Sequence, residues 1–320
     1  MPDSLASQGA ENLAGDGEST RTVIIAFFAN LAIAVAKSVV AMFSGSASML
    51  AEAAHSWADT GNQVLLFIAD RRGRKDPDAS HPFGYGRETY VWSMFAALGL
   101  FTVGAAVSVW HGITQLIHGG EEATYTWAYV VLGLSFLFEG ASFLQAFRQT
   151  RKEADHLDRD VLDHALRTSD PTLRAVFAED AAALIGIVLA TLGVGLHQLT
   201  GEAAFDAIGS ILVGLLLGVV AIVLIRRNLR FLTGEESDQR LRQAAIATVK
   251  SMRDVERVTY LRMEYVGPRQ VLLVAAVDIR GEEQESDVAR RLRAVEAELE
   301  EDPNIVDAVL TLSTPDEEDL

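Results

Sequence analysis

Residues 52–63, EAAHSWADTGNQ, place polar side chains inside an apolar segment that runs over residues 48–69. His55 and Asp59 are four residues apart, so a helix would place them one above the other on one face, and Asn62 continues that face. An imidazole and a carboxylate inside a membrane helix are costly to keep without a partner or a task. We therefore expect this helix to carry half of a metal site.

The composition supports a membrane protein and excludes several kinds of partner. The 320 residues are 49% hydrophobic and 22% charged, with a mean hydropathy of +0.19, which indicates apolar segments alternating with charged ones. A net charge of -17 argues against nucleic acid, because a phosphate backbone attracts Lys and Arg. The chain has no cysteine, so a metal would be held by His, Asp, Glu, Asn or backbone oxygen. Residues 1–19 lack the features of a signal peptide and are expected to be a disordered cytosolic tail.

Apolar segments of roughly twenty residues, the length that a spanning helix needs, recur along the chain. They cover residues 22–43, 48–69, 90–117, 127–147, 172–199 and 205–225. These segments predict a six-helix transmembrane domain over residues 20–234. Only SGSA separates the first two, which predicts a tight helical hairpin. Asp170 and Pro171 supply an N-cap and a first helical residue for the fifth helix.

Basic residues mark one side of the membrane. They lie in the loops after the second, fourth and sixth segments, whereas the alternate loops (44–46, 118–126 and 200–202) contain no Lys or Arg. The positive-inside rule then places both termini in the cytoplasm. We expect an integral protein of the cell (inner) membrane, in contact with the lipid bilayer.

From residue 235 the pattern changes to that of a soluble domain. It predicts a helix over residues 237–252, strands over 257–266 and 270–279, a helix over 287–301 capped by Ser286, and a strand over 305–312. This order predicts a ferredoxin-like α+β domain over residues 235–314. Residues 315–320 are expected to be a solvated acidic tail.

Several polar residues lie deep in the apolar segments: Asn30, Lys37, His55, Asp59, Asn62, Glu139, Glu179 and Asp180. Ionisable groups at membrane depth are functional by default. The alternative is an internal salt bridge, for instance Lys37 with Glu139 or Asp180, but one lysine cannot neutralise this many acids. The set His55, Asp59 and Asp180 suits Zn²⁺, with Mn²⁺, Fe²⁺ and Co²⁺ as alternatives. Such ligands exchange protons for metal, and His55 is the natural proton-exchanging group.

Other features are weaker candidates. Asp78 and His81 are three residues apart in a loop and could form an accessory metal site with only two ligands. His156 and His164 lie in an acidic loop that is expected to be a solvated charge run. His111, His118 and His197 are expected to have interfacial roles. No nucleophile–base pair or nucleotide-binding loop occurs, so an enzyme is not expected.

Four motifs together resemble the cation diffusion facilitator family of metal/proton antiporters over almost the full chain. They are SGSASMLAEAAHSWADTGNQ, HPFGYGRETY, FAEDAAALIG and FDAIGSILVGLLLG, at residues 44–63, 81–90, 177–186 and 205–218. The pairs Glu139–Gly140 and Glu179–Asp180 resemble the zinc-transporter-nine-like branch. The resemblance implies a homodimeric secondary active transporter with a tetrahedral site between its second and fifth helices.

The family pattern is matched only in part. His55, Asp59 and Asp180 fit three ligand positions, but Val176 stands where the family usually has His or Asp. Glu179, Asn62, Glu139 or a water are candidates to complete the sphere, although Glu179 lies about 100° round the helix from Asp180. Asp78 and His81 fit the family's loop site, while Tyr85 replaces a second loop histidine. No histidine follows His197, so no metal site is expected in the C-terminal domain, which would serve to dimerise.

The expected function is proton-coupled efflux of a divalent metal, Zn²⁺ first, from the cytosol by alternating access and without a cofactor. The alternatives are a Mn²⁺ or Fe²⁺ exporter of the same family and a non-transporting partner subunit of an active transporter.

Overall fold

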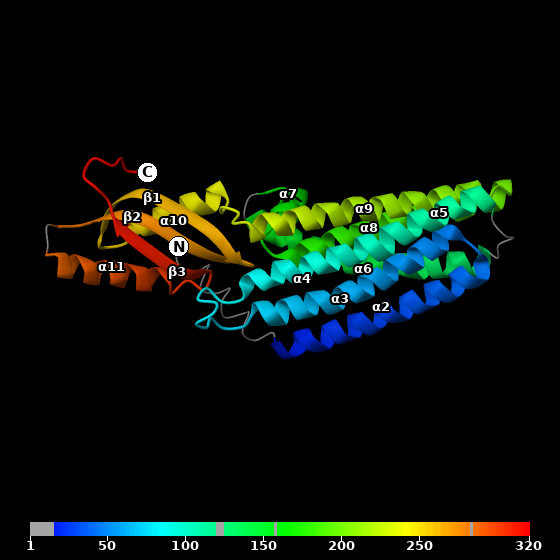
Figure 1. Ribbon diagram of the computed structural model, residues 1–320, viewed down its shortest axis with the longest axis horizontal. Helices are drawn as coiled ribbons and strands as arrows, with labels where there is room; N and C mark the ends of the chain where they lie inside the picture. The colour runs from blue at the N-terminus through cyan, green and yellow to red at the C-terminus, as the bar shows by residue number, and fades with distance from the viewer. Residues whose placement is uncertain (1–15, 120–124, 157–158, 282–283) are drawn as a thin grey trace. The chain divides into compact units, whose positions relative to one another are not determined.

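The computed structural model describes residues 16–119, 125–156, 159–281 and 284–320. The predicted disordered tail lies outside these ranges up to residue 15, and helix begins at Asp16. Two compact units form, and Figure 1 shows their elements. The helical unit comprises Glu18–Arg71 and Tyr90–Leu229, and the sheet unit comprises Arg72–Thr89 and Arg230–Leu320. The loop after the second helix is therefore part of the sheet unit, which the predicted domain boundaries did not anticipate.

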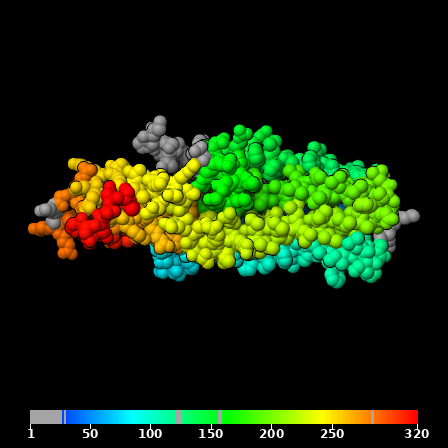
Figure 2. Space-filling model, turned by 90° about the horizontal axis from the view of Figure 1, so that it is seen from above, coloured from blue at the N-terminus to red at the C-terminus, as the bar shows by residue number. Residues whose placement is uncertain are grey.

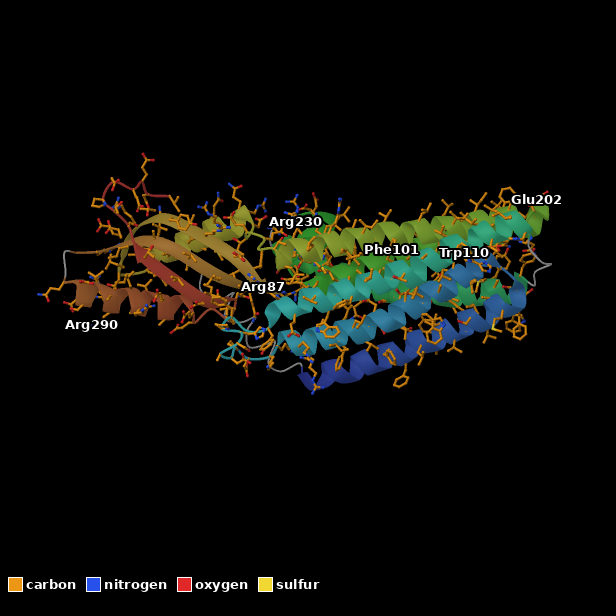
Figure 3. The ribbon with its side chains drawn as sticks, in the orientation of Figure 1. Arg87, Phe101, Trp110, Glu202, Arg230 and Arg290 are labelled. Carbon is orange, nitrogen blue, oxygen red and sulfur yellow. The ribbon has the colours of Figure 1, made fainter. Side chains whose placement is uncertain are left out.

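All six predicted helices form within the described residues. They are α2 (Asp16–Ser44), α3 (Ala47–Gly73), the run α4 (Gly86–Gly99), η1 (Leu100–Ala106) and α5 (Val107–His118), then α6 (Tyr125–His156), α8 (Pro171–Thr200) and α9 (Ala204–Leu232). Four of them are long and apolar enough to cross a membrane: Gly86–His118, Tyr125–Asp155, Pro171–Thr200 and Ala204–Leu232. Large apolar side chains such as Phe101 and Trp110 point outward from the bundle (Figure 3), as lipid contact requires. Spans at α2 and α3 stay predictions.

The predicted start of the fifth helix is confirmed. The Asp170 carboxylate accepts hydrogen bonds from the Thr172 and Leu173 amides at 3.0 and 3.2 Å. Pro171 is the first helical residue, where its missing N–H costs nothing. Gly201, with φ +75°, ends the helix in the left-handed conformation that glycine adopts without strain.

A buried carboxylate on α9 caps the start of α3. The Asp206 carboxylate accepts from the Ala47 amide at 2.7 Å, from the Ser48 amide at 3.2 Å and from the Ser46 hydroxyl at 2.8 Å. The Ser48 hydroxyl donates to the Asp206 carbonyl at 2.8 Å, and Gln115 of α5 reaches the same carboxylate at 3.4 Å. Because Asp206 is fully buried, these donors offset its desolvation. The cap fixes the helix that carries the first half of the predicted site.

The third helix is not regular throughout. Its centre, η1, is π-helical, whereas the sequence predicted an unbroken α-helix. Single π-turns inside helices often mark functional sites. Leu100 and Ala105 of this segment pack in one core cluster with Ala58, the neighbour of Asp59. The irregular turn therefore lies against the helix that bears the predicted metal ligands.

The loop between α6 and α8 contains a short helix, α7 (Val161–Arg167), that the sequence analysis missed. His164 is only 4% exposed, and its Nε2 lies 3.2 Å from a Glu153 oxygen on α6. The expectation that His164 belongs to a solvated charge run is therefore wrong, because this histidine fastens α7 to α6. The side chain of His156 lies outside the described ones.

The sheet unit has the predicted order of elements. These are α10 (Gln239–Ser251), β1 (Val255–Gly267), β2 (Gln270–Ile279), α11 (Glu285–Leu299) and β3 (Ile305–Leu312). The sheet order is β1-β2-β3, with β1 antiparallel and β3 parallel to β2. Val258, Leu273 and Val277 alternate into a core closed by Val249 of α10 and Val295 of α11. The predicted cap at Ser286 is wrong, since α11 begins two residues earlier than predicted, at Glu285, with Gln284 at the N-cap position.

The acidic tail is exposed but attached to the edge of β1. The Asp319 carboxylate accepts from the Val258 amide at 3.1 Å and from Lys250 Nζ at 2.7 Å, and the Leu320 amide donates to the Val258 carbonyl at 2.9 Å. Figure 2 shows the red tail lying over the yellow and orange α10 and β1. The tail is solvent-exposed along its length, and its last residues also bond to a strand edge, a common way to block unwanted pairing.

Candidate functional site

The polar face of α3 forms as predicted. His55 Nε2 lies 3.3 Å from Oδ2 of Asp59, which is one helical turn further on. The His55 side chain is 1% exposed and that of Asp59 is 15% exposed. Asn62 extends the face by three residues and is buried. The second helix therefore presents an imidazole and a carboxylate together, away from bulk water.

The two acids of α8 face different helices. The Glu179 carboxylate accepts a hydrogen bond from Asn62 Nδ2 of α3. The Asp180 carboxylate accepts from the Ser142 hydroxyl of α6 at 2.6 Å. Glu179, which sequence reasoning treated as a poor substitute ligand, is therefore the α8 acid bonded to α3, and Asp180 is bonded to α6.

A buried ion pair joins α2 to the same region. Lys37 Nζ lies 3.0 Å from Glu52 Oε2, and both side chains are fully buried. Neither expected partner of Lys37, Glu139 or Asp180, takes this place. Sequence reasoning missed Glu52, although it precedes His55 by three residues and so lies on the same helical face.

Charges of one sign dominate this part of the bundle. Asp59 interacts electrostatically with Glu139, Glu179 and Asp180, and Glu139 interacts with Glu52. Lys37 is the cation that these acids share. When ionised, these five carboxyl groups would outnumber the single ammonium and would stabilise a divalent cation among them.

Several buried atoms of this cluster have no hydrogen-bond partner among the described residues. They are Glu52 Oε1, both ring nitrogens of His55, Asp59 Oδ1, Asn62 Oδ1 and Glu179 Oε1. Each buried polar atom left unpaired costs about 1–3 kcal/mol. Oxygen and imidazole nitrogen are ordinary ligands of Zn²⁺ and of related divalent metals. The donor set therefore fits a metal ion as the missing partner.

The candidate ligands are not gathered into a finished site. Across the part of the chain that the structure describes, no three His, Asp or Glu side chains lie close enough together to hold one metal ion. His55 and Asp59 are together, while Asp180 is held by Ser142. The structure thus brings together the two candidate ligands of α3, and no acid of α8 completes a three-ligand group with them.

Comparison with known proteins decides the family. Residues 23–233 match the family model for the cation efflux transmembrane domain. The chain belongs to the cation diffusion facilitator family. Together with the four apolar helices, this makes it an integral membrane protein of a transporter family.

Relatives place this family member in the zinc-transporter-nine-like branch. It is 36% identical over 267 residues to a metal tolerance protein of Arabidopsis thaliana, covering 83% of this chain and 58% of the relative. It is 35% identical over 240 residues to a mitochondrial proton-coupled zinc antiporter of Xenopus laevis, covering 75% of this chain and 43% of that protein. A magnetosome protein of Paramagnetospirillum magneticum is 24% identical over 243 residues, 76% of each chain. The chain spans about half the length of the first relatives that it matches.

The loop residues considered for an accessory site bind one another. Asp78 accepts from the Ser80 amide at 2.9 Å, the Ser80 hydroxyl at 2.5 Å and the Tyr85 hydroxyl at 2.8 Å. These hydrogen bonds, that of the Ser80 hydroxyl first, hold the pKa of Asp78 well below its usual range. The His81 ring stacks on Tyr85 at 4.0 Å, and its Nδ1 lies 3.8 Å from Asp78. Tyr85, at the family's second loop-histidine position, thus completes a hydrogen-bonded turn in this chain.

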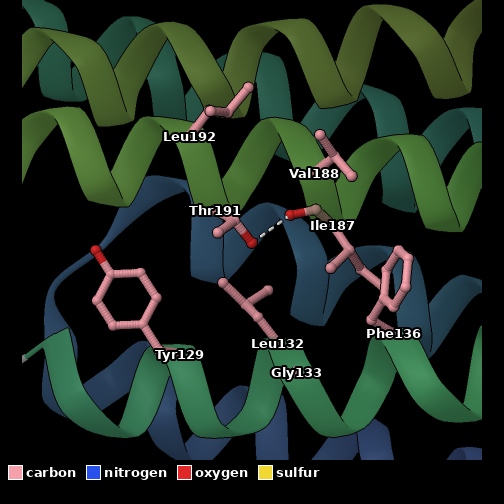
Figure 4. A pocket seen from close by; sticks show the side chains of 8 residues that line it. All are labelled: Tyr129, Leu132, Gly133, Phe136, Ile187, Val188, Thr191 and Leu192. Atoms are coloured by element: carbon pink, nitrogen blue, oxygen red, sulfur yellow. Dashed lines mark hydrogen bonds between the residues drawn. The ribbon is translucent and has the colours of Figure 1, made fainter.

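A groove between α6 and α8 is separate from the charged cluster (Figure 4). Its wall is almost entirely apolar, and the Thr191 hydroxyl within it donates to the Ile187 carbonyl at 2.7 Å. It is lined by Tyr129, Leu132, Gly133, Phe136, Ile187, Val188, Thr191 and Leu192. No lining side chain is ionisable apart from Tyr129, so this groove does not supply metal ligands.

Proposed function

We propose that this cation diffusion facilitator exports Zn²⁺ from the cytosol in exchange for protons. The observation that carries the proposal is the pair His55 and Asp59, buried with unpaired atoms beside the acids of α8. The mitochondrial antiporter of Xenopus laevis is named as proton-coupled and zinc-transporting, which supports both features.

In this proposal His55, Asp59 and Asp180 bind the ion, and Glu179 takes the position that Val176 cannot fill. Asn62 and Glu139 orient or assist these ligands. Metal binding requires deprotonated ligands, so arrival of the cation releases protons and returning protons expel the cation. Any of His55, Asp59, Glu179 and Asp180 that carries a proton in the empty site would have to release it when the cation binds. Rocking of helices around such a midplane site gives alternating access.

The wider assembly is part of the same proposal. Six helices span the cell (inner) membrane with both termini in the cytoplasm, as the distribution of Lys and Arg favours. Two chains form a homodimer through the C-terminal part of the sheet unit, residues 230–320, which contains no histidine and so has no imidazole with which to bind zinc. No cofactor takes part.

Reconstituted protein tests the site. In proteoliposomes with a pH gradient, the parent should move Zn²⁺ and protons in opposite directions across the membrane. His55→Ala and Asp180→Ala should abolish both fluxes. His118→Ala is the matched control, because this histidine is exposed and its Nδ1 lies 3.0 Å from the Thr114 carbonyl of its own helix, outside the polar cluster. Transport by His55→Ala and Asp180→Ala at the parental rate would refute the ligand assignment. Faster transport of Mn²⁺ or Fe²⁺ than of Zn²⁺ would identify the cargo as one of those ions.

A second candidate function is that of a non-transporting partner subunit. The absence of a finished three-ligand group in the described residues and the valine at position 176 favour it. Calorimetric titration of the purified protein with ZnCl₂ separates the two. One zinc ion bound per chain supports transport. If His55→Ala binds as much zinc as the parent, or if the parent binds none, the partner role is supported.

A further inference from the structure

The buried ion pair between Lys37 and Glu52 has no part in the ligand set described above. It lies at the junction of three helices, since Lys37 is on α2, Glu52 is on α3, and a Cβ added to Gly186 of α8 would come 2.8 Å from Glu52 Oε1. Both charged side chains are fully buried. Burying an ion pair carries a large desolvation penalty, and a hydrophobic pair in its place would often be more stable. Stability alone is therefore a poor reason for its presence.

The lysine shares its electrostatic surroundings with the proposed metal ligands. Its ammonium interacts with the charges of Glu139 and Asp59, as well as with Glu52. It also interacts with His55. Glu52 links the ion pair to the proposed metal ligands, because it precedes His55 by about one helical turn on the buried face of α3. Any cation bound by His55 and Asp59 would share these acids with the ammonium.

We propose that Lys37 is a tethered counter-cation of the transport site, which weakens metal binding enough for the ion to leave. This rests on the proposed function. A site completed by His55, Asp59, Glu179 and Asp180 would hold a divalent ion tightly, and a carrier must bind its ion weakly enough to release it. A fixed positive charge opposes the ion through their mutual repulsion. Glu52 sets the strength of that repulsion, because its carboxylate holds the Lys37 ammonium against α3 and partly neutralises its charge.

Two single substitutions should change zinc affinity in opposite directions. Lys37→Gln removes the opposing charge, so the Kd for Zn²⁺ should fall by about tenfold or more, and the maximal transport rate should fall because release is slower. Glu52→Gln frees the ammonium to interact with Asp59 and Glu139, so the Kd should rise by a similar factor. The double variant Lys37→Gln/Glu52→Gln leaves the net charge unchanged and should bind zinc within a fewfold of the parent. Lys37→Arg, which keeps the charge, is the control.

The measurement is calorimetric titration of full-length, detergent-purified protein with ZnCl₂, on monodisperse fractions whose thermal unfolding is recorded. A merely structural ion pair predicts lower unfolding temperatures for both single variants and no change, or the same direction of change, in their Kd. That result would overturn the proposal. If Lys37→Gln does not fold, Glu52→Gln and the double variant still decide it, because their affinities are expected to differ. A parent that binds no zinc would instead overturn the proposed function itself.

Discussion

At the scale of single residues, α8 divides its two acids between two neighbours. Glu179 bonds to Asn62 of α3, and Asp180 bonds to Ser142 of α6. Because the two acids lie about 100° apart around α8, rotation of this helix would change which acid faces His55 and Asp59. The adjacent carboxylates therefore give this chain two ways to complete a site in which Val176 supplies no ligand.

Substitutions at positions 176 and 179 test which acid is the ligand. Glu179→Gln should weaken Zn²⁺ binding by about 10- to 100-fold, the usual loss when a group that supports a metal site is removed. Val176→His should restore tight binding in the Glu179→Gln background, because it puts an imidazole one turn before Asp180. Calorimetric titration of the four proteins forms a double-mutant cycle. Equal effects of Glu179→Gln in both backgrounds would show that the two positions do not substitute for each other.

The candidate ligands on α3 could be predicted from the sequence, and the role of Glu179 could not. Helical periodicity fixes that His55, Asp59 and Asn62 share one face, because the 3.6-residue repeat relates them within one helix. Periodicity does not fix how α8 is rotated against α3 and α6. That rotation depends on tertiary packing, so the sequence could not decide between Glu179 and Asp180. Glu52 was missed although its spacing to His55 carried the signal.

At the scale of elements, small residues let α5 and α9 approach closely. The Ser210 hydroxyl of α9 donates to the Ser108 carbonyl of α5 at 2.8 Å. A Cβ added to Gly112 would lie 2.7 Å from the Ala207 carbonyl oxygen. Backbone at this distance cannot move aside as a side chain can, so the contact requires glycine.

A pair of glycine substitutions tests this packing. Gly112→Ala should destabilise the protein by about 1–3 kcal/mol, because the methyl group overpacks the contact with α9. Gly99→Ala is the matched control, since an added Cβ there meets nothing within 4 Å, and it should be neutral or stabilising by up to about 1 kcal/mol. Thermal unfolding in detergent measures both. Equal unfolding temperatures for the two variants would contradict the close approach of α5 and α9.

Helix positions and strand order followed from hydrophobic patterning, but irregular elements did not. The bounds predicted for β2 and β3 agree with the structure, because alternating burial has a clear period. The π-helical segment η1 has no periodic signal of its own in a run that is apolar on every side. The helix α7 is seven residues long, too short for periodicity to stand out from a charged loop. The attachment of the tail depends on contacts between residues about 60 positions apart.

At the scale of the whole molecule, the absence of cysteine makes orientation easy to test. Asp76→Cys and Glu202→Cys place single thiols at exposed positions in loops of opposite predicted sidedness. A membrane-impermeant maleimide applied to intact cells should label position 202, and it should label position 76 only after permeabilisation, because the basic loops face the cytoplasm. The parent, with no thiol, is the control. Labelling in the reverse order would invert the topology and with it the direction of transport.

The tail of the sheet unit should respond to acid. The Lys250 ammonium, followed by the Val258 amide, holds the pKa of Asp319 below its ordinary value of 3.8. A lowered folded-state pKa means that the stabilisation is fully present above that ordinary value and is lost as the pH falls through the lower one. Hydrogen exchange at Val258 should therefore stay slow above about pH 5 and gain speed, relative to its intrinsic rate, below pH 3.8. Asp319→Ala should show the faster exchange already at neutral pH, while a peptide from β2 should not.

The cap that Asp206 places on α3 turns this helix into a lever with a fulcrum at one end. The carboxylate fixes Ala47 and Ser48, whereas His55 lies about 12 Å further along the axis and Gly73 about 39 Å along it, at 1.5 Å per residue. A tilt that moves His55 by 1 Å would therefore move the far end of α3 by about 3 Å. The same ratio applies to a motion that starts at the far end of α3. A displacement at Gly73 would be about a third as large at the proposed metal ligands on α3. That is small enough to adjust their distances to α8 while the helix packing is kept.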